Sequence, residues 1–226
     1  MNTPTSSRAA STVTQAADFV STVFSLCEDP GKRAALRSGL GRPLDGCPRM
    51  HQVIAARVPR GGPDGERAYY AVAAMIAALP PQARNSEPET AGARAAAENG
   101  PADDAEGAAG PENNGAVHRR NFGQCLAEGV QRGVLRENTA EARLSLLTRQ
   151  SVDGVHRHLP AAVRVLADRP SAVDWTQLLS DLYWWDRYRD QITRRWLQSY
   201  YRTRAAAEQQ AAEQADRADH DAPAAE

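Results

Sequence analysis

Apolar side chains recur along this chain at intervals of three and four residues, which is the repeat of an amphipathic α-helix. The first stripe contains Val13, Ala17, Val20, Phe24 and Cys27. Further helical segments follow at residues 50–58, 66–79, 121–133, 138–150 and 155–166. Stretches that alternate apolar and polar residues, as strands do, do not occur. The pattern therefore predicts an all-α protein.

Short polar motifs indicate where several of these helices begin. Asp29 and Pro30 supply an N-cap and a first-turn proline for a second helix. Asn138 and Asp174 are each followed three residues later by Glu or Gln, which is the spacing of a capping box. Pro160 should kink or restart the helix at 155–166, because proline lacks the backbone N–H. Asp174 opens the last and longest predicted helix, which spans residues 175 to 204.

One face of this long helix is apolar. On a wheel of about 100° per residue, Trp185 and Trp196 fall on the same side as Ile192. Both tryptophans are therefore expected in the core. Arg189 falls on this side as well, where it would either extend its charged end to water or pair with a buried acid such as Asp181.

The opposite face carries arginine and glutamine with no acid between them. This line, called the basic ridge below, consists of Arg187, Gln191, Arg194, Gln198 and Arg202, and Arg195 flanks it. Solvated helices usually interleave acids, because like charges at this spacing repel slightly. A row of cations suits a nucleic-acid backbone, since each phosphate contact releases condensed counterions. The alternative is a merely exposed face. Trp184, on the side of Arg195, would stack on an unpaired base or pack against another helix or subunit.

Charge is distributed unevenly along the chain, although the net charge is only −1. Residues 81–117 carry two arginines and seven acids, and residues 205–226 carry one arginine and six acids. The remaining body therefore has a net charge of +9. Such a body favours a polyanionic partner over simple charge drift.

The two acidic segments are also low in complexity. Residues 81–117 contain almost no large apolar side chains and cannot offset the entropy of ordering. We therefore expect two small helical bundles, at residues 1–80 and 118–204. A disordered acidic linker at 81–117 would join them, and an acidic tail at 205–226 would extend the last helix only briefly.

Signatures of catalysis and of membrane insertion are missing from the sequence. The five histidines are scattered and form no set of three or four metal ligands. No P-loop, GxSxG or HExxH motif occurs. No apolar run approaches the roughly 18 residues of a membrane span, and three scattered cysteines without CxxC spacing favour a reducing cytoplasm. We expect a cytoplasmic protein without enzymatic activity, cofactor, metal or small-molecule substrate.

Five segments in order carry a resemblance to a known family. They read DPGKRAALRSG, ERAYYAVAAMIAALP, NFGQCLA, TAEARLSLLTRQSVDGVHRHLPAAVRVLA and VDWTQLLSDLYWWDRYRDQITRRWLQSYY. In this order they resemble the CasB family, the small subunit of the type I-E CRISPR complex Cascade. The resemblance implies an all-α, non-catalytic subunit that pairs with a second copy of itself. It also implies contacts with the large and backbone subunits, the guide RNA, and the target DNA including its displaced strand.

The resemblance also implies which side chains bind nucleic acid. The family's basic helix positions correspond best to Arg37, Arg143, Arg149, Arg164 and Arg187. The helical wheel adds Arg194, Arg195 and Arg202 to these candidate nucleic-acid-binding residues. Arg120, which precedes the helix after the linker, is a further candidate. Gln124 departs from the family, which often has a basic residue there. The expected function is non-specific binding of the nucleic-acid backbone that stabilises opened target DNA. The alternative is a protein-only scaffold whose basic face contacts acidic partner proteins.

Overall fold

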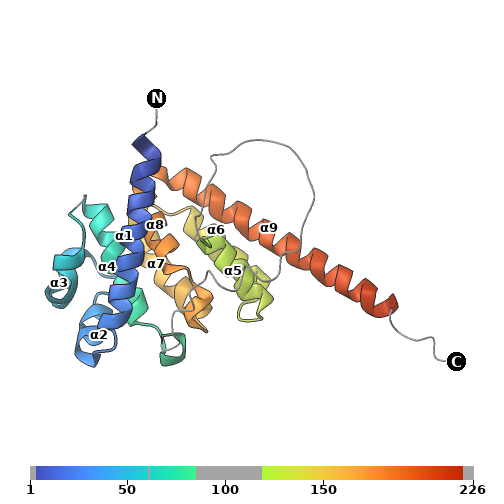
Figure 1. Ribbon diagram of the computed structural model, residues 1–226, viewed down its shortest axis with the longest axis horizontal. Helices are drawn as coiled ribbons and strands as arrows, with labels where there is room; N and C mark the ends of the chain where they lie inside the picture. The colour runs from blue at the N-terminus through green and yellow to red at the C-terminus, as the bar shows by residue number, and fades with distance from the viewer. Residues whose placement is uncertain (1–3, 61, 85–118, 221–226) are drawn as a thin grey trace.

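The computed structural model describes residues 4–60, 62–84 and 119–220, and within these ranges the chain forms helices and short loops (Figure 1). The described part contains no strand, so the prediction of an all-α fold is confirmed. Its α-helices are α1 (Pro4–Leu26), α2 (Pro30–Arg37), α3 (Pro48–Ile54), α4 (Pro63–Ala77), α5 (Phe122–Gln131), α6 (Glu137–Thr148), α7 (Val152–Leu166), α8 (Trp175–Tyr183) and α9 (Trp185–His220). Short 3-10 turns lie at Leu44–Gly46, Ala55–Arg57, Pro81–Ala83 and Pro170–Ala172.

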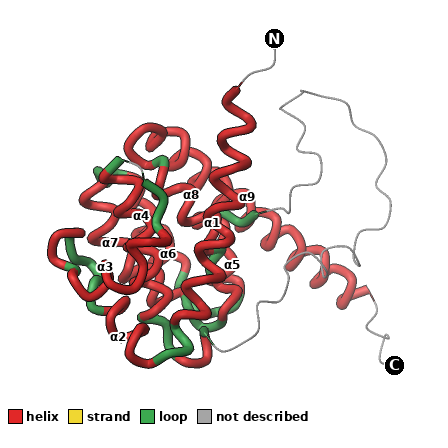
Figure 2. The backbone as a smooth tube through the Cα atoms, turned by 60° about the vertical axis from the view of Figure 1, so that its left-hand side comes forward, coloured by secondary structure: helices red, strands yellow, loops and turns green. Residues whose placement is uncertain are grey.

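The helices pack around a core that runs from one end of the body to the other. Helix α8 packs against α1 and α4, α7 contacts α4, α5 and α6, and α5 lies along α9. Helices from before and after residues 85–118 are thus in direct contact, and the division into bundles at 1–80 and 118–204 stays a prediction. The predicted linker lies outside the described residues from residue 85 onward. In both views the C-terminal part of α9 projects beyond the body (Figures 1 and 2).

Side-chain caps start several helices, as the sequence indicated. The Asp29 carboxylate accepts hydrogen bonds from the backbone N–H groups of Gly31 and Lys32, at 2.7 and 3.0 Å. Asp174 accepts one from the N–H of Gln177 at 2.9 Å. Each cap satisfies backbone donors that lack a partner inside the helix, so the predicted starts of α2 and α8 are confirmed.

The prediction that Asn138 caps a helix is wrong. Helix α6 begins at Glu137 after Arg136, which provides no side-chain cap. The preceding turn sets this start: Gly133 has a φ of 72°, a region that L side chains rarely adopt. The turn buries Leu135, and the N-cap position of α6 is Arg136, two residues before the predicted cap at Asn138.

Helix α7 continues through Pro160, so a restart of the helix at this residue is wrong, while a kink there stays a prediction. Leu159 and Val163 are buried on either side of the proline. Their packing holds the helix together although one backbone hydrogen bond is lost there.

The long helix predicted at 175–204 is divided into two. Helix α8 ends at Tyr183 and α9 begins at Trp185, and Tyr188 has non-helical dihedral angles of −126° and 25°. The half-buried Trp184 packs edge-on against Tyr183, with ring centroids 5.0 Å apart, and against Tyr188 at 5.7 Å. This division lets α8 pack on α1 and α4 while α9 packs on α5. Helix α9 then continues to His220, well beyond the expected end.

A buried carboxylate joins α8 to α9. Asp181 is 2% exposed and accepts hydrogen bonds from Trp196 Nε1 at 2.6 Å and from Gln177 Nε2 at 2.8 Å. Arg195 forms an ion pair with the same carboxylate. Arg189, which the wheel offered as a partner for Asp181, is exposed and pairs with Asp190 at 3.3 Å.

Trp196 also fixes the distance between α9 and α5. Its ring lies 5.1 Å from that of Trp185 and 5.3 Å from that of Phe122. A Cβ atom on Gly123 would lie 1.9 Å from the Trp196 carbonyl oxygen. The absence of a side chain at Gly123 therefore permits the close approach of the two helices. Both tryptophans are fully buried, as predicted.

We expect Gly123→Ala to lower the free energy of unfolding by roughly 2–3 kcal/mol, because the new methyl group would overlap backbone atoms that cannot rotate away. Urea denaturation followed by circular dichroism measures this change. Gly46→Ala is the control, since a Cβ atom at Gly46 would meet nothing nearer than 3.8 Å. Equal stability of the two variants would contradict the close contact.

Neighbouring arginines on α9 should differ in their contribution to stability. Arg195→Gln removes the cation that pairs with the buried Asp181 and should cost roughly 1–3 kcal/mol. Arg194→Gln alters an exposed side chain and should change stability by less than about 0.5 kcal/mol. Thermal unfolding of both variants tests the difference, and equal effects would show that Arg195 does not anchor the helix.

Candidate nucleic-acid interface

The basic ridge lies on the outer face of α9. All five of its side chains are exposed, and none of its three arginines forms an ion pair within the described chain. The opposite face of α9 is held against the body by the buried Ile192, Trp196 and Tyr200. From Gln191 to Arg202 the ridge therefore faces solvent over roughly 16 Å, at about 1.5 Å per residue. Arg187 is also exposed, but it lies before the non-helical Tyr188, where the regular helical wheel does not apply.

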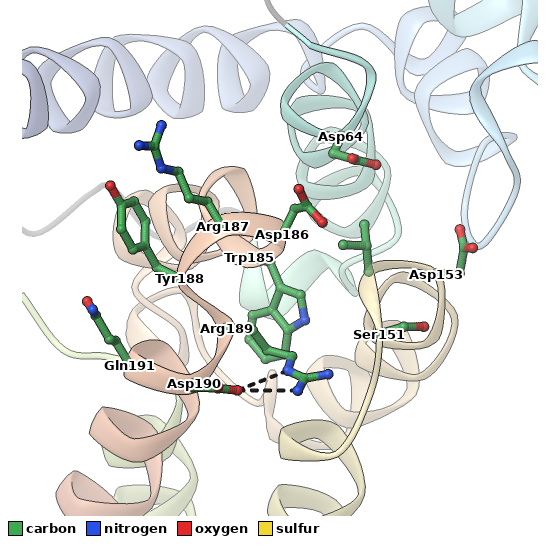
Figure 3. Close-up of a pocket in the computed structure, with 11 residues that line it drawn as sticks. Asp64, Ser151, Asp153, Trp185, Asp186, Arg187, Tyr188, Arg189, Asp190 and Gln191 are labelled. Carbon is green, nitrogen blue, oxygen red and sulfur yellow. Dashed lines mark hydrogen bonds and ion pairs between the residues drawn. The ribbon is translucent and has the colours of Figure 1, made fainter.

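Acidic side chains border the N-terminal end of the ridge. A pocket of about 650 Å³ beside this end is lined by Asp64, Asp153, Asp186 and Asp190, among others (Figure 3). Arg187 points away from these carboxylates, and its guanidinium carbon lies 5.5 Å from the centre of the Tyr188 ring. Asp153 and Asp190 are paired with Arg67 and Arg189. Asp64 and Asp186 form no ion pair in the described chain and oppose an anion near Arg187, so Arg194 and Arg202 are the ridge cations best placed for a phosphate.

Two of the arginines expected to bind nucleic acid, Arg120 and Arg195, form ion pairs within the body, and their role in binding stays a prediction. Arg195 pairs with Asp181, although its side chain is still 52% exposed. Arg120 lies 2.5 Å from Glu128 and donates a hydrogen bond to the Ser171 carbonyl oxygen at 2.5 Å. These contacts tie the start of α5 to the segment before α8. A guanidinium that already has such partners is less available to a phosphate.

Arg143 is half-buried on α6, and its Nε atom is buried without a hydrogen-bond partner. Arg37, Arg149 and Arg164 are exposed and form no ion pair with the described residues. Arg37 lies on α2, Arg149 at the end of α6 and Arg164 on α7. Helix α2 packs mainly on α3 and α4, and α7 packs on α4, α5 and α6. Helix α6, which carries Arg143 and is followed by Arg149, also contacts α9. The role of all four arginines in binding stays a prediction.

Past the ridge, α9 becomes acidic. Arg204 ties this part of the helix to α6 through Glu137 at 3.0 Å, and it also pairs with Glu208 at 3.3 Å. The Glu137 carboxylate raises the pKa of Arg204. Beyond this point Glu213 and Asp216 are exposed on a continuous helix. One helix therefore carries a basic outer face in its first half and acidic side chains in its second.

The histidines, cysteines and acids of the described residues do not form a metal site. No group of three or more His, Cys, Asp or Glu residues there could hold a metal ion. The three cysteines are free and buried, and burial raises the pKa of the Cys125 thiol to about 12. Within the same ranges, no helix has the length and apolar character needed to cross a membrane.

The comparisons with known proteins agree on one family. The sequence profile of CRISPR-associated protein Cse2 matches residues 32–201. A chain of a CRISPR RNA-guided surveillance complex is 32% identical to this chain, with a TM-score of 0.69, over 88% of this chain and 99% of its own. A chain of a second such complex, described as pre-nicking, is 34% identical, with a TM-score of 0.70, over 88% and 98%.

A Cse2-family CRISPR-associated protein from Thermus thermophilus is 20% identical, with a TM-score of 0.56, over 82% of this chain and 97% of its own, and this likeness supports the fold alone. No curated protein matches the chain. The profile covers well over half of the sequence, and two structural relatives exceed 30% identity along nearly their whole length. The chain therefore belongs to the Cse2 family, the CasB small subunits that its sequence resembles.

Proposed function

We propose that this chain is the non-catalytic small subunit of a Cascade-type, RNA-guided CRISPR surveillance complex in antiviral defence, and that it binds the nucleic-acid backbone without sequence preference. The basic ridge is the observation that carries the binding role. Arg194 and Arg202 lie along one solvent-facing side of a helix whose other side is fixed in the core. Arg187 is exposed just before the break at Tyr188, and none of the three forms an ion pair in the described chain. Membership of the Cse2 family supports the assignment to the complex.

The ridge suits recognition of phosphate and not of base sequence. Guanidinium groups match phosphate oxygens in geometry and charge, whereas a convex helix face with cations and glutamines offers no pocket that selects a base. Each contact would release condensed counterions, so affinity for a single strand should fall with salt by a log–log slope of about 0.7 per phosphate contact.

In such a complex, guide pairing reads the target sequence and protein contacts hold the opened strands. Arginines that neutralise the backbone of a separated strand would slow reclosure of the duplex and stabilise the R-loop. The partners we propose are the large and backbone subunits, a second copy of this chain, the guide RNA, and the target DNA including its displaced strand. This assembly would form in the cytoplasm, and it requires no small-molecule substrate.

A protein-only scaffold is the second candidate, and a specific observation favours it. Arg120 and Arg195 are engaged in ion pairs, and acids border Arg187. Fewer free cations are therefore available than the sequence suggested. In this alternative the ridge would contact acidic surfaces of neighbouring subunits and would not need a nucleic acid.

Copurification tests membership of the complex directly. The tagged full chain, expressed with the large and backbone subunits and a guide RNA, should elute with all of them at a fixed stoichiometry. Elution of the chain alone, while the other subunits assemble without it, would contradict the assignment.

The contribution of the ridge is tested with Arg194→Gln combined with Arg202→Gln. Loss of two phosphate contacts should reduce the salt slope of single-strand binding by about 1.4, and lower affinity at low salt. Fluorescence anisotropy with a labelled oligonucleotide measures both quantities. The control variant combines Arg136→Gln with Arg169→Gln, which removes the same charge from exposed positions off the ridge. Equal losses in the two variants would indicate a diffuse charge effect, and no loss in either would favour the scaffold.

A further inference from the structure

A second pocket, of about 350 Å³, lies between the loop after α2 and the helices α4 and α7. We call it the arginine pocket, because Arg42 from the loop, Arg67 from α4 and Arg157 from α7 line it. These helices lie on the side of the body away from the projecting end of α9 (Figure 1). The arginine pocket shares Asp153 with the pocket beside the N-terminal end of the ridge. Its arginines are far apart in the sequence, so no spacing pattern indicated them.

The three cations act on the same small volume. A hydrogen bond and the charge of Arg67, together with the charge of Arg157, lower the pKa of Asp153. Burial raises the pKa of the Cys47 thiol in the pocket wall, and the charge of Arg42 opposes this rise. Asp153 is the one acid that lines the pocket within the described chain. Three guanidinium groups against one carboxylate leave a net positive charge.

The backbone conformation and contacts between residues of the pocket wall hold the three arginines in place. Gly41 has a φ of 71°, which L side chains rarely adopt, and it turns the chain so that Arg42 reaches the pocket. On α4, the Tyr70 hydroxyl lies 2.8 Å from Nδ1 of His51, which fixes the tyrosine in the wall. Arg67 is oriented by its ion pair with Asp153. Arg42 and Arg157 are exposed and have no ion-pair partner in the described chain.

A histidine with no hydrogen-bond partner lies in the lining. His156 is 5% exposed, and both of its ring nitrogens are buried and unpartnered. Burial, and secondarily the charge of Arg67, lower the pKa of His156 to about 4, so the imidazole is neutral at pH 7 and keeps one N–H group. A buried donor without an acceptor is unfavourable. The site therefore offers two unpaired cations, Arg42 and Arg157, and a third, Arg67, that is shared with Asp153. The His156 nitrogens lie beneath the pocket surface, so an anion with several acceptor oxygens would be held by the arginines.

We infer that the arginine pocket binds a phosphate group. A carboxylate is planar and is satisfied by a single guanidinium, whereas a phosphate presents oxygens in several directions and suits cations that converge from three segments. The volume exceeds that of a phosphate ion, so a phosphate carried by a larger molecule fits as well. Free phosphate esters and a nucleic-acid backbone share this chemistry. The identification of a nucleic-acid backbone as the source of the phosphate rests on the proposed function, whereas the phosphate site itself does not.

The experiment titrates inorganic phosphate into the full chain at low ionic strength, with isothermal calorimetry as the readout. Saturable binding is expected, and it should weaken by about tenfold or more when Arg42→Gln and Arg157→Gln are combined. Arg136→Gln, at an exposed position outside the pocket, should bind phosphate as the wild type does. Asp153→Asn should bind about threefold more tightly, because it removes the competing carboxylate and frees Arg67. Circular dichroism shows whether each variant remains folded.

These outcomes separate the inference from a general charge effect. Absence of saturable binding, or equal weakening by Arg136→Gln, would overturn it. Acetate that competes as well as phosphate would also overturn it, in favour of an acidic side chain from a partner protein. An NMR titration adds an independent readout, since a bound anion should raise the pKa of His156, and an unchanged pKa at saturating phosphate would exclude this location.

A short single-stranded oligonucleotide distinguishes the two sources of phosphate. If the pocket holds a backbone phosphate, the combined Arg42 and Arg157 variant should also lose oligonucleotide affinity, and inorganic phosphate should compete. If it holds a free phosphate ester, the variant should lose only phosphate binding. In that second outcome the arginine pocket is still a phosphate site, and the proposed function is tested only by the ridge variants.

Discussion

The carboxylate of Asp181 is the constraint on which the arrangement of this molecule depends. A charge buried this deeply is tolerated only when surrounding donors satisfy it. Here the donors come from both sides of the break between α8 and α9, with Gln177 on one side and Arg195 and Trp196 on the other. Helix α8 is also packed on α1 and α4. The carboxylate therefore fixes α9 relative to the N-terminal helices.

The outward direction of the basic ridge follows from this anchor. Trp196 is held by Asp181 from one side and by the bare backbone of Gly123 from the other. Rotation of α9 about its axis would break the hydrogen bond or create a clash with α5. The arginines that face solvent do so because the tryptophan on the opposite face has a single position. A surface with a proposed role in binding is thus specified by a polar interaction in the core.

Local chemistry in the sequence predicted several features correctly, although the capping box at Asn138 and the helix restart at Pro160 were wrong. The helical class, the caps at Asp29 and Asp174, and the burial of Trp185 and Trp196 all follow from spacing along one segment. The break at Trp184 could not be predicted, because no glycine or proline marks it and it arises from packing on helices distant in sequence.

The sequence also could not separate structural arginines from available ones. Arg194 and Arg195 are adjacent and identical in type, yet only Arg195 reaches a buried acid. That difference depends on which side of α9 faces α8. The convergence of Arg42, Arg67 and Arg157 depends likewise on tertiary packing, since these residues come from three separate segments. Net charge located the basic body, but it did not show how many of its cations are free to bind.

The full length of α9 has a consequence for how the subunit meets a polyanion. Its first half has more arginines than acids and its second half has more acids than arginines, although Arg204 and Arg217 pair with Glu208 and Glu213 there. The net charge of the helix therefore changes sign along its length. The helix macrodipole points the same way. In the field of a nucleic acid such a helix experiences a torque that turns the acidic end away before any contact forms. The subunit would therefore arrive already aligned, with its angle of approach set by the sign change along one helix.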